Sequence, residues 1–353
     1  MSGAVPVTSA RMASVPRSLV TVDRAAIRHN AARLVDLLDG AELWAVVKAD
    51  AYGHGAADSA SAALEGGASA LCVATVGEAL ALRAVTPAAR IVVLGPVRPD
   101  ELRGAREARL ELVVVRDGPL PHGVPLHVKL DTGMGRWGVS ELAAPGTGVV
   151  GLMTHFATAD TDPAFVRVQL DRFLRATAQY AHLTRHAANS AAALGVPESR
   201  LDAARCGITL YGIDPFGEDA SRHGLRPALR WESEVVRVAE LQPGESTGYG
   251  RRFVAAEPTW VGIVPVGYAD GLSRDLTGTE VLVGGDRCSV VGAISMDAFA
   301  VRLPGPVVAG APVTIVGDGV TLERHARVAG TIAYELACGV RTDPARSVRM
   351  TVG

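Results

Sequence analysis

The hydrophobic pattern of the chain begins with one helix and then alternates short apolar strands with helical segments. Ile27, Ala31, Leu34 and Leu38 fall on one face of that helix, and Asp23 stands where an N-cap is expected. The predicted strands after this helix are 44–48, 70–74, 91–94, 111–115, 126–130, 149–153, 183–187 and 201–206. The predicted helical segments are 56–66, 77–85, 99–108 and 163–182. Eight strands with intervening helices favour an α/β fold, a (β/α)8 TIM-type barrel, over an open sheet.

The pattern changes near Arg230, where short β-type runs separated by Gly, Pro and Asp begin. Such runs are typical of a compact, mostly-β domain. They are 231–240, 259–266, 280–283, 287–292, 298–303 and 312–316, followed by a helix at 321–336 and a strand at 347–352. We therefore expect a flexible N-terminal tail (1–16), a barrel domain (17–228) and a C-terminal mostly-β domain (229–353).

Composition and charge narrow the classes of function. Hydrophobic residues make up 48% and charged residues 20% of the chain, and the net charge is −2, so no basic face for nucleic acid is expected. No apolar run has the length of a membrane span, and the N-terminus lacks the apolar core of a secretory signal. The four cysteines (Cys72, Cys206, Cys288 and Cys338) stand too far apart for a zinc site or a disulfide framework. We expect a cytoplasmic protein without a metal.

Lys48 ends the first predicted barrel strand and is the strongest candidate for chemistry. A lysine at the end of a buried strand is partly desolvated, which can lower its pKa and make it an amine nucleophile or base. A lone lysine in such a place more often extends to water. Here, however, Tyr52, His54 and two glycines follow within seven residues, and these suit a tight loop beside a ligand.

Polar side chains also follow four later barrel strands, at the end of the barrel where active sites lie. They include Lys129, Asp131 and Arg136 after the fifth strand, His155 after the sixth, Asn189 and Ser190 after the seventh, and Arg205, Gly207 and Tyr211 at or after the eighth. Five polar clusters at one end of a barrel predict an active site there.

The segment 133–138 matches the dinucleotide-binding pattern G-x-G-x-x-G. The stretch from Val139 to Gly148 is short and interrupted by Pro145 and glycines, so no helix is expected to receive a pyrophosphate. The pattern therefore does not predict a dehydrogenase.

The run 45–55 resembles the lysine motif of the alanine racemases, which bind pyridoxal 5'-phosphate. Further segments resemble the same family in the same order: 129–136, 154–160, 186–192, 205–212, 248–250, 265–271, 295–297 and 331–335. The resemblance extends from about Ser18 to the C-terminus. It implies a pyridoxal-phosphate barrel with a C-terminal β domain, a small amino acid as substrate, and a homodimer whose active sites combine both subunits.

The resemblance also implies two catalytic bases. Lys48 would form a Schiff base with pyridoxal phosphate and move the substrate α-proton on one face. Tyr249, supplied by the partner subunit, would act on the opposite face, because racemisation removes a proton from one side and returns it on the other. His155 would lie beside the Tyr249 hydroxyl and help it to act as a base.

The same resemblance assigns residues to the cofactor. The phosphate would be held by the hydroxyls of Tyr52, Ser190 and Tyr334 and by the backbone N–H groups of Gly207 and Ile208. Arg205 would face the pyridine nitrogen. Because an arginine donates and keeps its proton, it would leave that nitrogen unprotonated, weaken the electron sink and suppress transamination.

Five further residues are implied around the substrate. Arg136 would orient the phenolic oxygen of the cofactor and the substrate carboxylate. Lys129, which members of the family often carbamylate, would hold Arg136 in place. Met296 of the partner subunit would meet the substrate carboxylate through its backbone N–H, and Tyr268 and Asp297 would line the entrance.

Two features depart from the family pattern, and three alternatives remain open. The segment 338–346 is irregular, and Trp137 is bulkier than expected after Arg136. The prediction is a pyridoxal-phosphate-dependent isomerase, an alanine racemase that supplies D-alanine for peptidoglycan. The alternatives are a racemase of another small amino acid such as serine, a barrel amino-acid decarboxylase, which would carry a carboxylate at position 205, and a pyridoxal-phosphate carrier protein, which would resemble the barrel alone.

Overall fold

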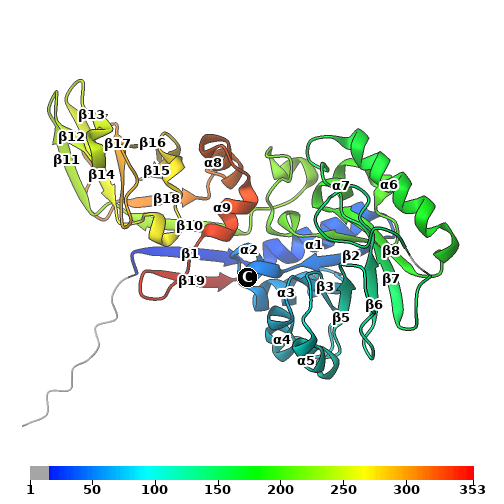
Figure 1. The fold of residues 1–353 in the computed structure, drawn as a ribbon. Coiled ribbons are helices and arrows are strands. Elements are labelled where there is room, and N and C mark those ends of the chain that lie inside the picture. The colour runs from blue at the N-terminus through cyan, green and yellow to red at the C-terminus, as the bar shows by residue number, and fades with distance from the viewer. Residues whose placement is uncertain (1–15, 143) are drawn as a thin grey trace, which may run out of the picture.

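The computed structural model describes residues 16–142 and 144–353, and it confirms a barrel followed by a mostly-β domain (Figure 1). Eight parallel strands close the barrel in sequence order, with β9 paired to β2. They are β2 (Glu42–Val46), β3 (Ala70–Val73), β4 (Ile91–Val93), β5 (Glu111–Val114), β6 (Leu126–Lys129), β7 (Val149–Met153), β8 (Thr184–Asn189) and β9 (Ala203–Cys206). Each overlaps one of the predicted strands.

Helical segments precede or follow the barrel strands, most of them on the outside of the barrel and the short α2 at its mouth. They are α1 (Arg24–Leu38), α2 (Lys48–Tyr52), α3 (Ala56–Glu65), α4 (Val76–Val85), α5 (Leu102–Glu107), α6 (Pro163–Thr177) and α7 (Ser190–Gly195). The predicted cap is confirmed, since the Asp23 carboxylate accepts a hydrogen bond from Ala26 N. The short α2 and α7 were not predicted, and both lie directly after barrel strands.

The second domain is built on a nine-stranded sheet in the order β11-β14-β17-β16-β15-β18-β10-β1-β19. Its strands are β1 (Ser18–Asp23), β10 (Leu229–Glu234), β11 (Arg237–Leu241), β14 (Thr259–Val264), β15 (Glu280–Val283), β16 (Asp286–Val291), β17 (Phe299–Leu303), β18 (Pro312–Val316) and β19 (Ser347–Val352). A separate hairpin, β12 (Ser246–Thr247) with β13 (Phe253–Val254), stands at its far end, and α8 (Leu322–Ala329) and α9 (Ala333–Gly339) lie between sheet and barrel (Figure 1).

The structure differs from the prediction at three places. Ser18–Asp23 pairs with β10 and β19, so this strand belongs to the second sheet and not to the predicted barrel domain of 17–228. The run 231–240 contains two strands that pair with different neighbours, β18 and β14. The predicted helix 321–336 is two helices, because Gly330 ends α8 with a φ of 68°. Residues 1–15 of the predicted tail lie outside the described residues.

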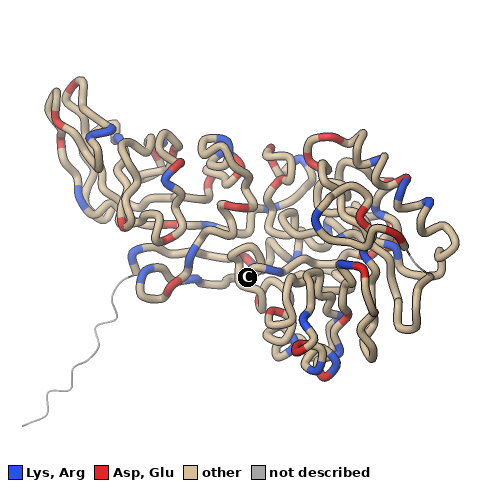
Figure 2. The backbone as a smooth tube through the Cα atoms, viewed as in Figure 1, with Lys and Arg blue, Asp and Glu red and all other residues tan. Residues whose placement is uncertain are grey.

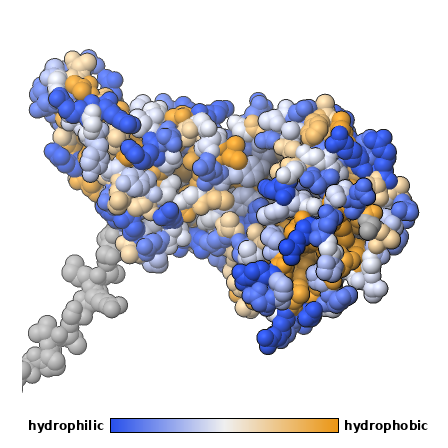
Figure 3. Space-filling model, viewed as in Figure 1, coloured by the Kyte–Doolittle hydropathy of each residue, from blue (hydrophilic) through white to orange (hydrophobic). Residues whose placement is uncertain are grey.

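Charged residues of both signs are distributed along both domains. Blue and red segments intermingle over both domains in Figure 2, as the net charge of −2 leads one to expect. On the face seen in Figure 3, apolar side chains gather on the barrel. Within residues 16–142 and 144–353, no helix combines the length and the apolar character needed to cross a bilayer. The same residues contain no cluster of three or more His, Cys, Asp or Glu side chains suited to a metal ion.

Candidate active site

Lys48 leaves β2 and enters a left-handed turn. The four residues after it, Ala49–Tyr52, all have φ between 50° and 56°, a conformation that costs L-residues about 1–2 kcal/mol each. The surrounding structure holds the turn: Ala49 N donates to the Glu78 carboxylate at 2.8 Å, and Gly53 N donates back to Ala49 O at 3.1 Å. This reversal of hand directs both Lys48 and Tyr52 into one cavity.

That cavity has a volume of 390 Å³ and lies at the carboxyl ends of the barrel strands, where α9 also borders it. The predicted site residues that line it are Lys48, Tyr52, Lys129, Arg136, His155, Ser190, Arg205, Gly207 and Tyr334. Its other lining residues are Val46, Ala74, Leu94, Gly95, Trp137, Met153, Asn189 and Cys338. Several of these follow strand ends too, but most carry no polar group that would have marked them in the sequence.

The cavity is strongly cationic. Lys48, Lys129, Arg136 and Arg205 all line it, and among the residues that the structure describes no Asp or Glu side chain does. Burial and then the nearby Arg136 charge lower the pKa of Lys48. Burial, Arg136 and Arg205 lower the pKa of Lys129 to about 8. Four crowded cations without an acidic side chain in the cavity wall suit a ligand that carries several anionic groups.

Hydroxyl and backbone donors gather at one end of the cavity. Gly207 N and the Thr209 hydroxyl both donate to Ser190 Oγ at 3.0 Å. A Cβ atom on residue 207 would lie 2.4 Å from the Tyr52 hydroxyl oxygen, so only glycine lets Tyr52 approach this closely. The 3-10 helix η4 (Ile208–Tyr211) begins at this end of the cavity. Burial raises the pKa of Tyr52 and of Tyr334, and both hydroxyls therefore remain neutral donors.

Arg205 lies at the centre of the barrel mouth and is only 4% exposed. Its guanidinium donates to the carbonyl oxygens of Thr154, His186 and Ala187 at 2.8–2.9 Å. Burial lowers the pKa of Arg205 to about 10, which leaves it charged at neutral pH. It also donates to His155 Nδ1 at 3.2 Å.

His155 is neutral in this environment. Burial and the Arg205 charge hold its pKa well below the usual range of histidine. Because Arg205 can only donate, His155 Nδ1 accepts and Nε2 carries the proton. In this chain the His155 imidazole is hydrogen-bonded to Arg205. Tyr249, which the family resemblance placed beside His155, does not line the cavity of its own chain.

The residues predicted to serve the partner subunit lie together on the second domain. Tyr249 is 76% exposed beside the β12–β13 hairpin, and Tyr268 and Met296 are also exposed. The loops that carry the latter two are joined, since Tyr268 N donates to Ser295 O and Ala269 N to Met296 O at 3.1 Å each. None of Tyr249, Tyr268 and Met296 lines the Lys48 cavity.

Arg346, in the irregular segment 338–346, fastens these loops to each other. Its guanidinium donates to Asp270 at 2.7 Å and to Asp297 at 2.8 Å. Asp270 is buried and accepts from Gly267 N at 2.8 Å. Asp297, predicted to line the entrance, is thus held in an ion pair. The roles of Asp270 and Arg346 were not predicted, because nothing in the sequence shows that these two residues meet.

Trp137, the other departure from the family pattern, packs beside two of the cations. The Arg136 guanidinium lies 5.1 Å and the Lys129 ammonium 5.8 Å from its ring centroid, within the range of cation–π attraction. The indole therefore forms part of the cavity wall and stabilises both charges.

The glycine-rich segment 133–138 does not bind a dinucleotide here. Backbone N–H groups of Gly133, Met134 and Gly135 donate to the Asp131 carboxylate at 2.8–3.1 Å. The N–H groups that a pyrophosphate would need are therefore already occupied, and residues 133–142 form no helix.

Comparison with known proteins identifies the family. Residues 22–215 match the family "Alanine racemase, N-terminal domain", and residues 228–348 match "Alanine racemase, C-terminal domain". The alanine racemase of Geobacillus kaustophilus is 40% identical over 357 residues, covering 91% of each chain. That of Lactiplantibacillus plantarum is 40% identical over 354 residues, covering 91% of this chain and 94% of the relative.

Solved structures of alanine racemases have the same fold as this chain. The biosynthetic alanine racemase of Pseudomonas aeruginosa superposes with a TM-score of 0.87 at 36% identity, covering 96% of this chain and 99% of the other. The alanine racemase of E. faecalis gives a TM-score of 0.85 at 34% identity, with 96% and 98% covered. Two family models that together match most of the chain, relatives at 40% identity and solved structures of the same fold show that the chain belongs to the alanine racemase family.

Proposed function

We propose that this chain interconverts L-alanine and D-alanine with pyridoxal 5'-phosphate as its cofactor. The observation that carries the proposal is the cavity in which Lys48, with a lowered pKa, lies among Lys129, Arg136 and Arg205 without an acidic side chain in its wall. A phosphate, a phenolate and a substrate carboxylate supply the anionic groups that such a cavity lacks. The family match supports the same reaction.

The residues present fit this cofactor group by group. Ser190, Tyr52, Tyr334 and the backbone N–H group of Ile208 would hold the phosphate, and Gly207 N–H would join them by exchanging its present acceptor, Ser190 Oγ, for a phosphate oxygen. The close approach of Tyr52 to Gly207 supports this assignment. Arg205 would donate to the pyridine nitrogen. Arg136 would donate to the phenolic oxygen and the substrate carboxylate, with Lys129 and Trp137 beside it. Pyridoxal phosphate supplies the electron sink that acidifies the α-proton of an amino acid.

Two bases would move that proton. Lys48 would bind the cofactor covalently and hold a proton at Nζ on one face of the substrate, and its lowered pKa favours the neutral amine that a base requires. Tyr249 of the partner subunit would act from the other face. The exposed position of Tyr249, Tyr268 and Met296, outside the cavity of their own chain, supports a homodimer with shared active sites.

Two alternative functions are disfavoured, and the cysteines indicate a location for the enzyme. A decarboxylase of this barrel type is disfavoured, because Arg205 occupies the position where a carboxylate is expected. A carrier protein is disfavoured, because the match includes the C-terminal domain. The four free cysteines suit a reducing compartment, so we place the enzyme in the cytoplasm, where D-alanine would serve peptidoglycan synthesis.

A coupled assay tests the proposal. Purified protein supplied with pyridoxal phosphate should form D-alanine from L-alanine, detected with D-amino-acid oxidase, and convert L-serine much more slowly. Lys48→Ala should lose activity and the borohydride-reducible link to the cofactor. Faster conversion of serine than of alanine would contradict the substrate, and a reducible link retained in Lys48→Ala would place the cofactor on another lysine.

A further inference from the structure

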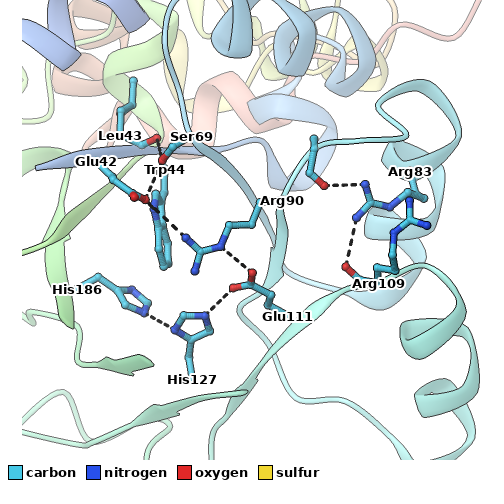
Figure 4. Close-up of polar contacts among 11 residues, drawn as sticks. Glu42, Leu43, Trp44, Ser69, Arg83, Arg90, Arg109, Glu111, His127 and His186 are labelled. Atoms are coloured by element: carbon cyan, nitrogen blue, oxygen red, sulfur yellow. Dashed lines mark hydrogen bonds and ion pairs between the residues drawn. The ribbon is translucent and has the colours of Figure 1, made fainter. Parts of the chain in front are cut away.

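A chain of hydrogen-bonded side chains runs through the interior of the barrel from Arg205 toward the opposite end. Arg205 Nη1 lies 2.9 Å from His186 Nδ1, and His186 Nε2 lies 3.0 Å from His127 Nδ1. His127 Nε2 then contacts the Glu111 carboxylate at 2.8 Å, and the other oxygen of Glu111 accepts from Arg90 Nε at 2.6 Å. Figure 4 shows the part of the chain from His186 to Arg90.

The two ends of the chain fix the direction of every hydrogen bond within it. Arg205 can only donate, so His186 Nδ1 accepts and the His186 proton is on Nε2. His186 Nε2–H then donates to His127 Nδ1, which places the His127 proton on Nε2, where it donates to the Glu111 carboxylate. A cation at one end and an anion at the other thus select one tautomer of each histidine.

The protonation states agree with this direction. Burial opposes ionisation of Glu111, but hydrogen bonds from His127 and Arg90 outweigh it and lower the pKa of Glu111 to about 2. Burial lowers the pKa of His127 and holds that of His186 well below its usual range. Both imidazoles are therefore neutral, and Glu111 is the charged acceptor at the end of the chain.

Packing leaves the two imidazoles little freedom. The Trp44 ring lies 4.4 Å from the His186 ring and 5.5 Å from the His127 ring, centroid to centroid. Beside His127, a Cβ atom on residue 151 would lie 2.1 Å from Nδ1, so Gly151 leaves the space that the His127–His186 contact needs. His127 and His186 are both fully buried.

We propose that His127 is a positioning residue of the reaction, which acts through His186 on Arg205. By accepting from His186 and donating to Glu111, it keeps His186 Nδ1 available as the acceptor that orients the Arg205 guanidinium. The proposal deepens the proposed function, because it rests on Arg205 facing the pyridine nitrogen of the cofactor. His127 itself does not line the cavity, so it would touch neither cofactor nor substrate.

Two substitutions of similar shape separate hydrogen bonding from packing. In His127→Gln, the amide oxygen can accept from His186 and the amide N–H can donate to Glu111, so the direction of the chain is kept. In His127→Met, a side chain of the same length as glutamine provides neither bond. We expect kcat for alanine to fall about 10-fold in His127→Met, as for other residues that orient a contacting group, with KM nearly unchanged, and to stay near the wild-type value in His127→Gln.

The tautomers provide a readout that does not depend on activity. ¹⁵N NMR of the histidine side chains in the protein as purified should show His186 and His127 as neutral Nε2–H tautomers, with His186 unchanged in His127→Gln and altered in His127→Met. A His186 proton on Nδ1 in the wild-type protein would overturn the chain, even if His127→Met failed to fold. Equal kcat in the two variants would overturn the positioning role. If the wild-type protein did not racemise alanine, the proposed function would fail while the NMR arm still decided the chain.

Discussion

At the scale of single residues, the most consequential property is the buried charge of Lys129. It is 3% exposed and lies among Arg136 and Arg205, which together with burial bring its pKa from 10.5 to about 8. Carbon dioxide reacts with the neutral form of an amine. With a pKa of about 8, part of Lys129 is neutral near physiological pH, so its environment favours the carbamylation that the family resemblance implies. The unmodified ammonium, in contrast, should destabilise the fold.

The pH dependence of stability tests this charge. Between pH 8 and 10.5 the unfolded chain binds the Lys129 proton and the folded protein does not, so stability rises with pH across that window, and below pH 8 the full penalty is present. Lys129→Met should therefore raise the free energy of unfolding at pH 7 by about 1–2 kcal/mol, because solvent screening reduces the effect below that of the full pKa difference, and its advantage over wild type should shrink toward pH 10.5. Urea unfolding in buffer free of carbon dioxide measures both; an advantage that stays constant with pH would contradict the buried charge.

Most polar residues that line the Lys48 cavity could be predicted from the sequence, but the contacts made by the residues around them could not. Lys48, Lys129 and Arg205 could be found because they are polar residues at or directly after apolar strands. The contact of Trp137 with two cations, and the pairing of Asp270 with Arg346, depend on loops whose path no periodicity encodes. Single residues of that kind become visible only in three dimensions.

At the scale of elements, the left-handed turn of α2 is the least expected feature. Ala49–Tyr52 contains no glycine, and the helical propensity of these residues gives no sign of φ values above 50° or of a change of hand. Glu78 binds the first N–H of the turn, and the ion pair of Asp50 with Arg349 ties it to β19. Tertiary contacts therefore overcome the local backbone preference and place Lys48 and Tyr52 on the same cavity.

Paired glycine substitutions measure this strain. Ala49 is exposed within the left-handed turn, and Ala57 is exposed within the right-handed α3. Ala49→Gly should raise the free energy of unfolding by about 1 kcal/mol, because glycine adopts positive φ without a steric cost. Ala57→Gly should lower it by about 1 kcal/mol. Urea unfolding at equal protein and cofactor concentrations compares them, and a free energy of unfolding that falls in Ala49→Gly as well would show that the turn is not strained.

The barrel strands were predictable because strands buried on both faces read as short apolar runs. The strand β1 was not, although Val20 and Val22 are fully buried in it. Its partners β10 and β19 lie about 200 and 330 residues later in the sequence, and a six-residue segment directly before a helix does not reveal which sheet it joins. Periodicity therefore located the elements, while long-range pairing decided the domain to which one of them belongs.

At the scale of the whole molecule, the proposed active site is divided between two surfaces. The cavity with Lys48 lies at the mouth of the barrel, and the hollow that contains Tyr268 shares Cys338 with that cavity. Tyr249 and Met296 project from the second domain, where the Arg346 ion pairs order the loops of Tyr268 and Met296. A two-fold dimer would bring the exposed surface of each subunit to the cavity of the other.

Complementation between two inactive variants tests this arrangement most directly. In a mixed dimer of Lys48→Ala and Tyr249→Ala, one site would carry both defects and the other would combine an intact Lys48 with an intact Tyr249. Random reassociation of equal amounts makes half of the dimers mixed, each with one working site, so activity on alanine should recover to about a quarter of the wild-type value. Subunit exchange is verified in parallel with differently tagged wild-type chains. No recovery despite demonstrated exchange would place both bases in one chain and contradict the shared active site.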